Sequence, residues 1–418
     1  MAITKPKGTA DVYGNHAALW RYIENTAHEI AATFGAQEMR TPTFEYAELF
    51  RKSVGETTDI VQKEMYNFTD QGGREYVLKP EGTAGAVRAY LENRLHDLAM
   101  PAKFYYITRL FRAERPQKGR LRQHTQFGAE YFGSYEPTAD AELINLAYIF
   151  LSKLGVDDLT LRINSIGDAE CRQRYNQALL TFLREKEESL CGLCRDRMEK
   201  NPMRVLDCKN EDCKAQIANA PLPLDYLSDD ACDHFNRLQK NLEILAIPFV
   251  VDKSIVRGLD YYTRTVFEFT SQDLGSQATV CGGGRYNDLI AKNGGAPAGA
   301  VGFGMGIERL LIILENQGKL PVVDDSIELF IGNIGEGGAE KALQIANYLR
   351  KHGISAITDL AGRNIKAQMK FANKIGAKLA IIIGDGELES GKVMVKSMAS
   401  GKEHELELDS IPNYFGLH

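Results

Sequence analysis

The spacing of apolar residues changes within the first fifty positions and predicts two different elements. From Ala17 to Phe34 the apolar residues recur with the helical period, and Gly35 is a residue type that commonly ends a helix. The stretch MRTPTFEYAELF, residues 39–50, lacks that period and predicts a short extended segment. Pro42 within it favours a strand start or an edge position, because proline has no amide hydrogen to donate to a neighbouring strand.

The next stretches predict a strand followed by a helix, and then a hairpin. EYVLKPEGTAGAVRAYLEN, residues 75–93, changes from strand to helix at Pro80. AKFYYITRLFRAE, residues 102–114, is rich in β-branched and aromatic residues and predicts a strand. HTQFGAEYFGSYE, residues 124–136, is its expected return strand, with RPQKGRL as the exposed connection.

The pattern changes twice more along the chain. From about residue 170 to 248 it is helical, charged and cysteine-containing, which indicates an insertion between two sheet-rich stretches. Strand patterns resume after the insertion in residues 250–270, 279–290 and 298–318. After Pro321 strands and helices alternate, which predicts a compact terminal α/β domain with a mainly parallel sheet. We therefore divide the chain into residues 1–325 and 326–418.

The composition is that of a globular protein, and it limits the cellular compartments and binding partners that we expect. Of 418 residues, 44% are hydrophobic and 25% are charged. No apolar run is long enough to span a bilayer and the start has no apolar signal core, so we expect no membrane association. Seven cysteines without a secretory signal favour a reducing compartment, and we expect a cytoplasmic protein. The net charge of −6 excludes indiscriminate coating of nucleic acid, but it allows a local basic site.

Basic charge is concentrated in one stretch, FRAERPQKGRLRQHTQFGAEYFG, residues 111–133. Five basic side chains lie within eleven residues: Arg112, Arg115, Lys118, Arg120 and Arg122. Guanidinium groups donate two parallel hydrogen bonds and therefore suit phosphate. The stretch predicts a site for an anion, and a solvated charged hairpin is the alternative interpretation.

Strand parity groups the polar residues of this stretch on common faces. Arg112 and Glu114 are two residues apart, so a strand would place both on one face. Gln126 and Glu130 share a face with Gly128 between them. The missing side chain at Gly128 is expected to leave room on the sheet for a flat ligand between two polar ends.

Two later stretches combine glycines or tyrosines with an arginine. GFGMGIER, residues 302–309, has three glycines at alternate strand positions, which suits a bare backbone surface beneath a nucleotide. Its G-x-G-x-G spacing is not the dinucleotide fingerprint, and glycines needed only for tight packing are the alternative. VRGLDYYTRTVFE, residues 256–268, places Arg257, Tyr261 and Tyr262 at the start of a strand. Tyrosine pairs there are more often cross-strand packing than ligand contacts, but the arginine favours a binding site.

Together these stretches resemble the bacterial histidyl-tRNA synthetase family of class II aminoacyl-tRNA synthetases. MRTPTFEYAELF resembles class II motif 1, FRAERPQKGRLRQHTQFGAE motif 2 and GFGMGIERLL motif 3. RGLDYYTRTVFE and GGGRYNDL resemble the two signatures peculiar to the histidyl enzymes, and KPEGTAG resembles their amino-acid-binding turn. The resemblance covers nearly the whole chain. It implies an α+β catalytic domain on a mainly antiparallel sheet with a helical insertion, followed by an α/β anticodon-binding domain.

The resemblance implies ATP-dependent ligation of L-histidine to its tRNA through a histidyl-adenylate. Arg112 and Arg257 are the implied catalytic residues, which clamp the α-phosphate and the carboxylate of histidine from two sides. The residues implied to bind histidine are Glu81, Gly82, Thr83, Arg112, Gln126, Glu130, Arg257, Tyr261 and Tyr262. The residues implied to bind ATP are Arg112, Glu114, Arg120, Gly304 and Arg309, with Mg²⁺ assisting.

The resemblance also implies a homodimer formed through motif 1 and contacts with the tRNA for histidine. Gln117 and Arg122 in the motif 2 loop are candidates to touch the acceptor stem. The basic helix expected in GRNIKAQMKFANK, residues 362–374, is a candidate RNA surface, although solvated charge explains it equally well. The rival hypotheses are a regulatory paralogue that charges no tRNA, another class II synthetase and a non-catalytic RNA-binding module.

Four of the seven cysteines lie in the expected insertion. Cys191 and Cys194 form C-x-x-C, and Cys208 and Cys213 follow as a C-x₄-C pair. This spacing is near that of structural zinc sites, but the second pair is wider than the usual one. Zinc and reduced thiols in a small helical module both remain open, and reduced thiols are the preferred expectation.

Overall fold

The computed structural model divides into two compact units, Met1–Pro321 and Val322–His418. The sequence placed this boundary after residue 325. The structure describes residues 3–56, 58–117, 119–206, 208, 210–255, 259–277, 279–322 and 326–417. No helix within these ranges is long and apolar enough to cross a membrane.

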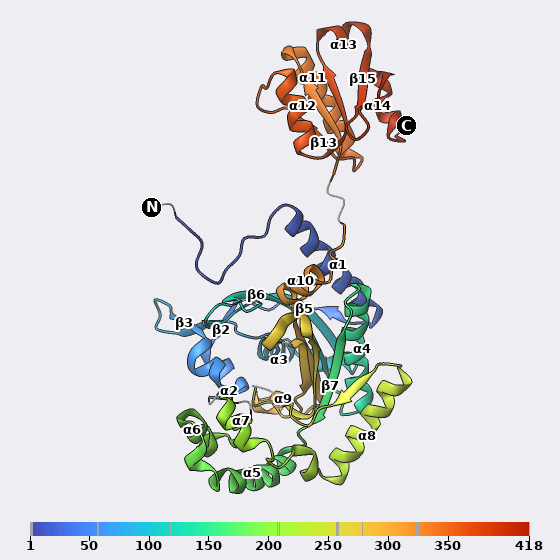
Figure 1. The fold of residues 1–418 in the computed structure, drawn as a ribbon. Coiled ribbons are helices and arrows are strands. Elements are labelled where there is room, and N and C mark those ends of the chain that lie inside the picture. The colour runs from blue at the N-terminus through green and yellow to red at the C-terminus, as the bar shows by residue number, and fades with distance from the viewer. Residues whose placement is uncertain are drawn as a thin grey trace. The chain divides into compact units, whose positions relative to one another are not determined.

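An eight-stranded sheet forms the centre of the first unit, in the order β1-β5-β6-β11-β10-β9-β7-β8 (Figure 1). Its strands are β1 (Gln37–Glu38), β5 (Ala102–Phe111), β6 (Gln123–Phe132), β7 (Leu159–Ser165), β8 (Phe249–Val251), β9 (Thr263–Ser271), β10 (Thr279–Arg285) and β11 (Ala300–Gly306). The pairings from β5 to β7 are antiparallel, whereas β1 and β8 are added in parallel at the two edges. The predicted, mainly antiparallel sheet is therefore confirmed.

Helices cover this sheet on both faces. The helices outside the insertion are α1 (Asn15–Thr33), α2 (Ala47–Val54), α3 (Thr83–Glu92), α4 (Pro137–Lys153), α9 (Leu289–Lys292) and α10 (Ile307–Asn316). Side chains alternate along β6, so Phe127 and Ala129 pack into the apolar core that includes α4 and α1. Gly128 and Glu130 point to the opposite face, where α3 packs with Tyr106 in a second core. This second face holds the candidate site.

Two predictions about local structure near the site are wrong. The extended segment expected over residues 39–50 contains only the short strand β2 (Phe44–Tyr46), because α2 begins at Ala47. The strand expected to carry Arg112 and Glu114 ends at Phe111. Beyond it the chain leaves the β6 partner, since the Ala113 amide donates to the Glu64 carbonyl at 2.7 Å. The two side chains are thus placed by a loop and not by a common strand face.

A small sheet of three strands lies beside the large one, in the order β2-β4-β3. It consists of β2, β4 (Glu75–Leu78) and β3 (Tyr66–Thr69), with antiparallel pairings. Strand β4 leads through Pro80 into α3, so the predicted change from strand to helix is confirmed.

The insertion is helical, as predicted. Its helices are α5 (Ala169–Arg184), α6 (Gly192–Lys200), α7 (Glu211–Ile217) and α8 (Asp229–Ile244). Helix α8 packs on α4 and shares the core of the large sheet. Helices α5, α6 and α7 form a separate small core around Tyr175, Leu179 and three of the cysteines.

The second unit is an α/β domain with a five-stranded sheet in the order β13-β12-β14-β15-β16. Its elements are β12 (Ile327–Asn333), α11 (Gly335–Lys351), β13 (Ala356–Thr358), α12 (Ile365–Lys374), β14 (Ala377–Ile383), α13 (Asp385–Ser390), β15 (Lys392–Ser397), β16 (Glu403–Glu407) and α14 (Ile411–Tyr414). The first three strands pair in parallel and the last two are added antiparallel. The expectation of a mainly parallel sheet is corrected to a mixed one.

Candidate active site

A buried carboxylate, Glu130, lies at the centre of the site on β6. It has no exposed surface. One carboxylate oxygen accepts hydrogen bonds from the Thr83 hydroxyl at 2.8 Å and the Tyr106 hydroxyl at 2.9 Å, and the other accepts one from the Tyr286 hydroxyl. Burial raises the pKa of Glu130 to about 8, and the three hydroxyl donors only partly oppose that shift. The site therefore holds a carboxyl group that gains or loses a proton near neutral pH.

A second buried carboxylate, Glu81, lies immediately before α3. It accepts the backbone amides of Thr83 at 2.8 Å and Ala84 at 2.7 Å, which satisfies donors that a helix start otherwise leaves unpaired. The Tyr261 hydroxyl also donates to it at 3.5 Å. Burial raises the pKa of Glu81, while these amides and the positive charge of Arg112 oppose the rise. Two buried carboxylates thus lie near each other among several hydroxyl donors, and we call this group the carboxylate pocket only as a candidate binding site.

Buried tyrosines pack beside these carboxylates. Tyr261 and Tyr262 directly precede β9 and are 2% and 5% exposed. Their ring centroids lie 4.7 Å apart, and the Tyr261 ring also meets Tyr286 edge-on at 5.6 Å. The Tyr261 hydroxyl thus lies beside Glu81, and Tyr262 packs against the Tyr261 ring.

Neighbouring side chains fill the space above the glycines of the site. The expectation of a bare backbone surface is therefore corrected. A Cβ atom added at Gly128 would lie 2.5 Å from the Tyr106 ring, so that ring fills the space expected for a ligand. A Cβ at Gly82 would meet the same ring at 2.4 Å. A Cβ at Gly302 would lie 1.6 Å from a Glu130 oxygen, and one at Gly304 would lie 2.3 Å from the Gln126 amide nitrogen. These glycines let polar side chains of β6 lie flat across β11.

Arg112 lies where β5 ends, beside the turn that carries Glu81. Its Nε donates to the Pro80 carbonyl at 2.9 Å, and its backbone amide donates to the Arg122 carbonyl at 2.8 Å. The charge of Arg112 acts on the Glu81, Glu114 and His124 ionisations. A guanidinium group therefore stands at the boundary between the carboxylate pocket and the basic loop.

A group of charged residues surrounds Arg309, the second residue after the start of α10. The Arg309 Nε donates to the Gly119 carbonyl at 2.9 Å and one Nη to the Thr279 carbonyl at 2.6 Å. Burial lowers its pKa, and the neighbouring charges of Arg120 and Arg112 lower it further. Three guanidinium groups from separate segments are thus close enough to repel one another. An anion bound among them would relieve that repulsion.

Glu114 lies inside this basic group. Its carboxylate pairs with the Arg120 Nε at 2.7 Å, and its carbonyl accepts from the Arg122 Nε at 3.2 Å. Burial raises the pKa of Glu114, although Arg120 opposes the rise. His124, on the neighbouring strand, stays neutral at physiological pH. Its pKa falls to about 3, mainly through burial and then through Arg112 and Arg309.

The two residues predicted to touch tRNA lie on the tight loop between β5 and β6. Gln117 and Arg120 exchange backbone hydrogen bonds of 3.0 and 2.9 Å. The Arg122 amide donates to the Gly8 carbonyl at 2.8 Å, which fastens the loop to the N-terminal segment. Arg257, the second predicted catalytic residue, lies outside the described residues.

Sequence reasoning missed Tyr106 and Glu308 as site residues and did not assign Tyr286 a role. Tyr106 pairs directly with Gly128 in the β5–β6 register, and an aromatic residue opposite a strand glycine is the signal that could have identified it. Glu308 accepts the Thr125 amide with both oxygens, at 2.8 and 3.0 Å, and burial raises its pKa to about 7. It fixes α10 against β6 and so places Arg309.

Comparison with known proteins gives one consistent family. The family model for histidyl-tRNA synthetase matches residues 8–310, and the model for an anticodon binding domain matches residues 328–416. The histidine–tRNA ligase of Caldanaerobacter subterraneus is 50% identical over 411 residues, which cover 98% of this chain and 99% of that protein. The histidine–tRNA ligase of Clostridium novyi is also 50% identical, over 98% of each chain. The crystal structure of the apo histidyl-tRNA synthetase of S. aureus superposes with a TM-score of 0.85 at 37% identity, covering 99% of this chain and 100% of that one.

Proposed function

We infer the function from one premise, which is that the chain belongs to the histidyl-tRNA synthetase family. It is a histidine–tRNA ligase, which uses ATP to join L-histidine to its tRNA through a histidyl-adenylate. The observation that carries this assignment is the buried pair Glu81 and Glu130 beside the arginines Arg112 and Arg309. This reaction needs partners for the ammonium and imidazole groups of histidine and cations for a polyphosphate, and these two groups of side chains supply them.

The first step brings two anions together. The carboxylate of histidine attacks the α-phosphate of ATP, the bond to the β-phosphate breaks, and pyrophosphate leaves. Negative charge accumulates on the phosphoryl oxygens, so catalysis consists mainly of positioning and electrostatic stabilisation. Arg112 is fixed between the two pockets through the Pro80 carbonyl and is assigned to clamp both reactants. Arg257 is assigned to the opposite side of the same phosphate by resemblance alone.

Histidine binds in the carboxylate pocket. Glu81, Thr83 and Gln126 receive its ammonium group, while Glu130 and Tyr262 form hydrogen bonds with its imidazole ring. Gly82 and Tyr261 line the pocket. The buried hydroxyls around Glu130 support this assignment, because a pocket of polar partners rejects an apolar amino acid by about 10⁴–10⁵.

ATP binds over β11 and the basic loop. Glu114 accepts from the adenine amino group, Gly304 lies beneath the nucleotide, and Arg120 and Arg309 contact the phosphates. Mg²⁺ supplies charge neutralisation on the triphosphate. Glu268, whose charge acts on Arg309, is a carboxylate of the kind that would hold this ion together with phosphate oxygens.

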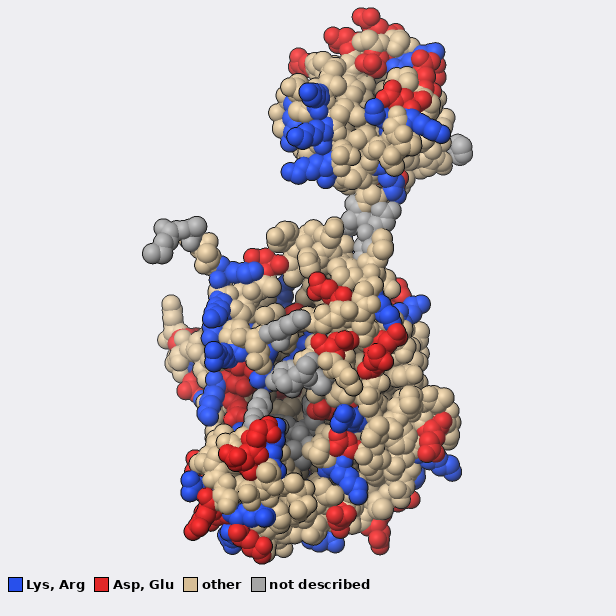
Figure 2. Space-filling view, viewed as in Figure 1, with Lys and Arg blue, Asp and Glu red and all other residues tan. Residues whose placement is uncertain are grey.

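The tRNA contacts both units. Gln117 and Arg122 on the loop between β5 and β6 meet the acceptor stem. In the second unit Lys366, Lys370 and Lys374 are exposed and spaced four residues apart, so they follow one side of α12. Figure 2 shows one cluster of Lys and Arg side chains on this unit, and further basic side chains among acidic ones elsewhere on its visible face. A row of solvated cations is suited to an RNA backbone.

The protein is proposed to act as a cytoplasmic homodimer. Phe44, Tyr46 and Phe68 on the small sheet are 50%, 53% and 43% exposed, which is unusual for aromatic side chains. They surround Tyr76, with ring centroids 5.0 to 5.8 Å from it. A second copy that covers this aromatic patch would remove it from water.

Light scattering tests the proposal of a homodimer. Phe44→Asp should yield monomers, whereas Tyr135→Asp, at another exposed tyrosine, should leave the dimer intact.

ATP–pyrophosphate exchange tests the function as a whole. The assay is run with each amino acid in turn, and tRNA charging is then measured separately. Exchange with histidine alone, followed by charging of histidine tRNA, is the expected result. Exchange without charging would favour the regulatory paralogue. Absence of exchange with every amino acid would refute the ligase.

A further inference from the structure

Four thiols converge in the insertion. The Sγ atoms of Cys191, Cys194, Cys208 and Cys213 all lie within 4.8 Å of one another. Cys194, Cys208 and Cys213 are buried and Cys191 is half-buried. Cys191 and Cys194 stand at the start of α6, Cys213 lies in α7, and Cys208 lies between these helices. The sequence left open whether the second pair would meet the first, and the fold brings all four together.

Backbone amides point at these sulfurs. The Cys191 amide donates to the Cys213 Sγ at 3.1 Å, and the Asn210 amide donates to the Cys208 Sγ at 3.4 Å. The Asn210 side chain in turn caps α7 by accepting the Cys213 amide at 3.1 Å. Such amides stabilise the thiolate form, which is the form that binds metal.

We propose that these four cysteines bind one structural Zn²⁺ ion. Zinc in such sites is tetrahedral with Zn–S distances of about 2.3 Å, which places the sulfurs about 3.8 Å apart. The observed spread therefore needs only a small contraction around the ion. Four sulfurs that are all mutual neighbours match a tetrahedron, and no ligand from outside the chain is needed to complete the set.

The core around the thiols is small, so a bound ion would stabilise the fold of this module. Among the residues that the structure describes, that core contains ten buried ones, and three of them are cysteines of the cluster. A module with so few apolar side chains buries too little surface to fix short helices, and metal is a common means of stabilising one. The ion would join α6, α7 and the segment between them.

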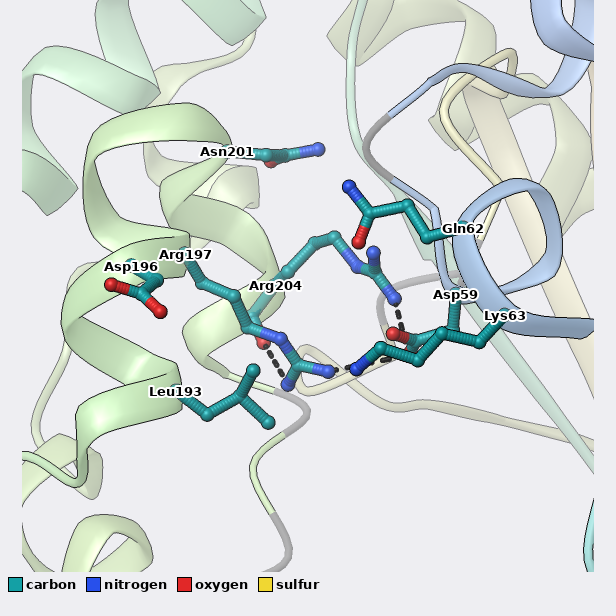
Figure 3. A pocket seen from close by; sticks show the side chains of 8 residues that line it. All are labelled: Asp59, Gln62, Lys63, Leu193, Asp196, Arg197, Asn201 and Arg204. Carbon is teal, nitrogen blue, oxygen red and sulfur yellow. Dashed lines mark hydrogen bonds and ion pairs between the residues drawn. The ribbon is translucent and has the colours of Figure 1, made fainter.

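Helix α6 and the segment after it face residues 59–63 across a polar pocket, shown in Figure 3. Arg197 of α6 and Arg204 beyond it both pair with Asp59, at 3.3 and 2.8 Å. The Asn201 side chain donates to a carboxylate oxygen of Asp260 at 3.0 Å. Asp260 directly precedes Tyr261, which lines the pocket assigned to histidine.

Helix α5 holds the same segment from another side. The Arg172 guanidinium donates to the carbonyls of Asp260 at 3.4 Å and Tyr262 at 3.2 Å. Loss of the metal is therefore expected to loosen the loop that carries Tyr261 and Tyr262. This second expectation rests on the proposed function, whereas the metal site itself does not.

Metal analysis of the full chain, purified under reducing conditions with zinc supplied, tests the site directly. About one zinc per chain is expected. Replacement of zinc by Co²⁺ should give thiolate-to-cobalt charge-transfer bands and the intense visible bands of tetrahedral cobalt. Cys194→Ser should lose both the zinc and these bands, whereas Cys232→Ser, at the exposed cysteine of α8, should keep them.

Three results would overturn the proposal. The first is a folded protein that holds no zinc and gains no cobalt bands. The second is zinc that survives in a folded Cys194→Ser variant, and the third is iron in place of zinc. If Cys194→Ser does not fold, the metal content and cobalt spectrum of the unmodified chain decide the question.

A separate measurement tests the link to the histidine pocket. Removal of zinc by a chelator should raise the KM for histidine in pyrophosphate exchange more than the KM for ATP, and added zinc should restore it. Asn201→Ala should reproduce this selective rise with the zinc retained. Equal changes in both KM values would refute the link to the histidine pocket. The zinc site itself would still be tested by the metal content. A chain with zinc but without any exchange would refute the ligase and leave the site standing.

Discussion

The carboxylate pocket and the arginine group lie on one sheet, but the protein satisfies their charges in opposite ways. Glu81 and Glu130 are buried, and hydroxyls and amides of the chain surround them. Arg112 and Arg309 donate hydrogen bonds to backbone carbonyls, which carry no net charge. Burial lowers the pKa of Arg309, and the nearby charges of Arg120 and Arg112 lower it further. The acidic region is thus surrounded by neutral donors of the fold, whereas the basic region sets guanidinium groups beside one another and beside the Glu114 carboxylate.

This difference predicts that a substitution at Arg112 acts mainly on the transition state and one at Glu130 mainly on binding. Arg112→Ala should show the largest effect. Removing one donor to a developing phosphoryl charge is expected to lower kcat for adenylate formation by about 10²–10³. Arg109→Ala, at an exposed arginine of the adjoining strand β5, is the matched control and should change little. A loss confined to the KM for histidine would contradict the assigned role.

Glu130→Gln should have the next largest effect. An amide in place of the carboxyl would leave a buried hydrogen-bonding group opposite the imidazole unsatisfied, which costs about 1–3 kcal/mol, so kcat/KM for histidine is expected to fall about 10–100-fold. The change should appear chiefly in KM, since the carboxyl contacts the side chain and not the reacting atoms. Steady-state pyrophosphate exchange at fixed ATP measures it. An unchanged KM would mean that histidine lies elsewhere.

The same substitution should change how stability depends on pH. Because the folded-state pKa of Glu130 is raised to about 8, the folded chain holds a proton that the unfolded chain releases near pH 4.5. Stability from this group is present at low pH and declines as pH rises from about 4.5 to about 8. The Tm of Glu130→Gln should therefore fall less over that window than the Tm of the unmodified chain. A steeper fall in the variant would contradict the shift.

Gly302→Ala tests how closely the acidic region is packed. The added Cβ would lie 1.6 Å from the Glu130 carboxylate, which three hydroxyls hold in place. Overpacking of this kind costs about 1–3 kcal/mol. Gly304→Ala should cost less, because the nearest atoms there belong to the end of the half-buried Gln126 side chain. Denaturant unfolding of the two variants measures the difference, and a reversed order would contradict it.

Arg120→Ala should have the smallest effect. Its pair with Glu114 is partly exposed, and such pairs contribute about 0.2–1 kcal/mol. The KM for ATP is expected to rise less than tenfold, with little change in the KM for histidine. A loss as large as that of Arg112→Ala would show that the basic group acts as one unit.

The sequence predicted the elements of the site better than its contacts. The β5–β6 hairpin and the start of α3 followed from residue period and Pro80, because these signals are local. The place of Arg112 was predicted wrongly as strand. The end of β5 depends on the Ala113 amide bonding to Glu64, some fifty residues away. Parity along a single strand carries no information about such a contact.

The thiol cluster shows the same limit. Spacing alone suggested a C-x-x-C pair and a wider second pair, and the wider spacing counted against a metal site. The turn at Asn210 and the helix α7 bring Cys213 back toward Cys191, which requires the cap that Asn210 provides. That cap is readable in the sequence, but its effect on the meeting of two distant pairs is not.

The Tyr106 ring fills the space above Gly82 and Gly128, and its hydroxyl binds Glu130. A larger residue at Gly82 or Gly128 therefore requires a smaller residue in place of Tyr106. That second substitution would also remove the hydrogen bond from the Tyr106 hydroxyl to Glu130. Attempts to alter amino-acid selectivity by one-at-a-time mutagenesis should stall at these positions. Libraries that vary all three together offer the workable route.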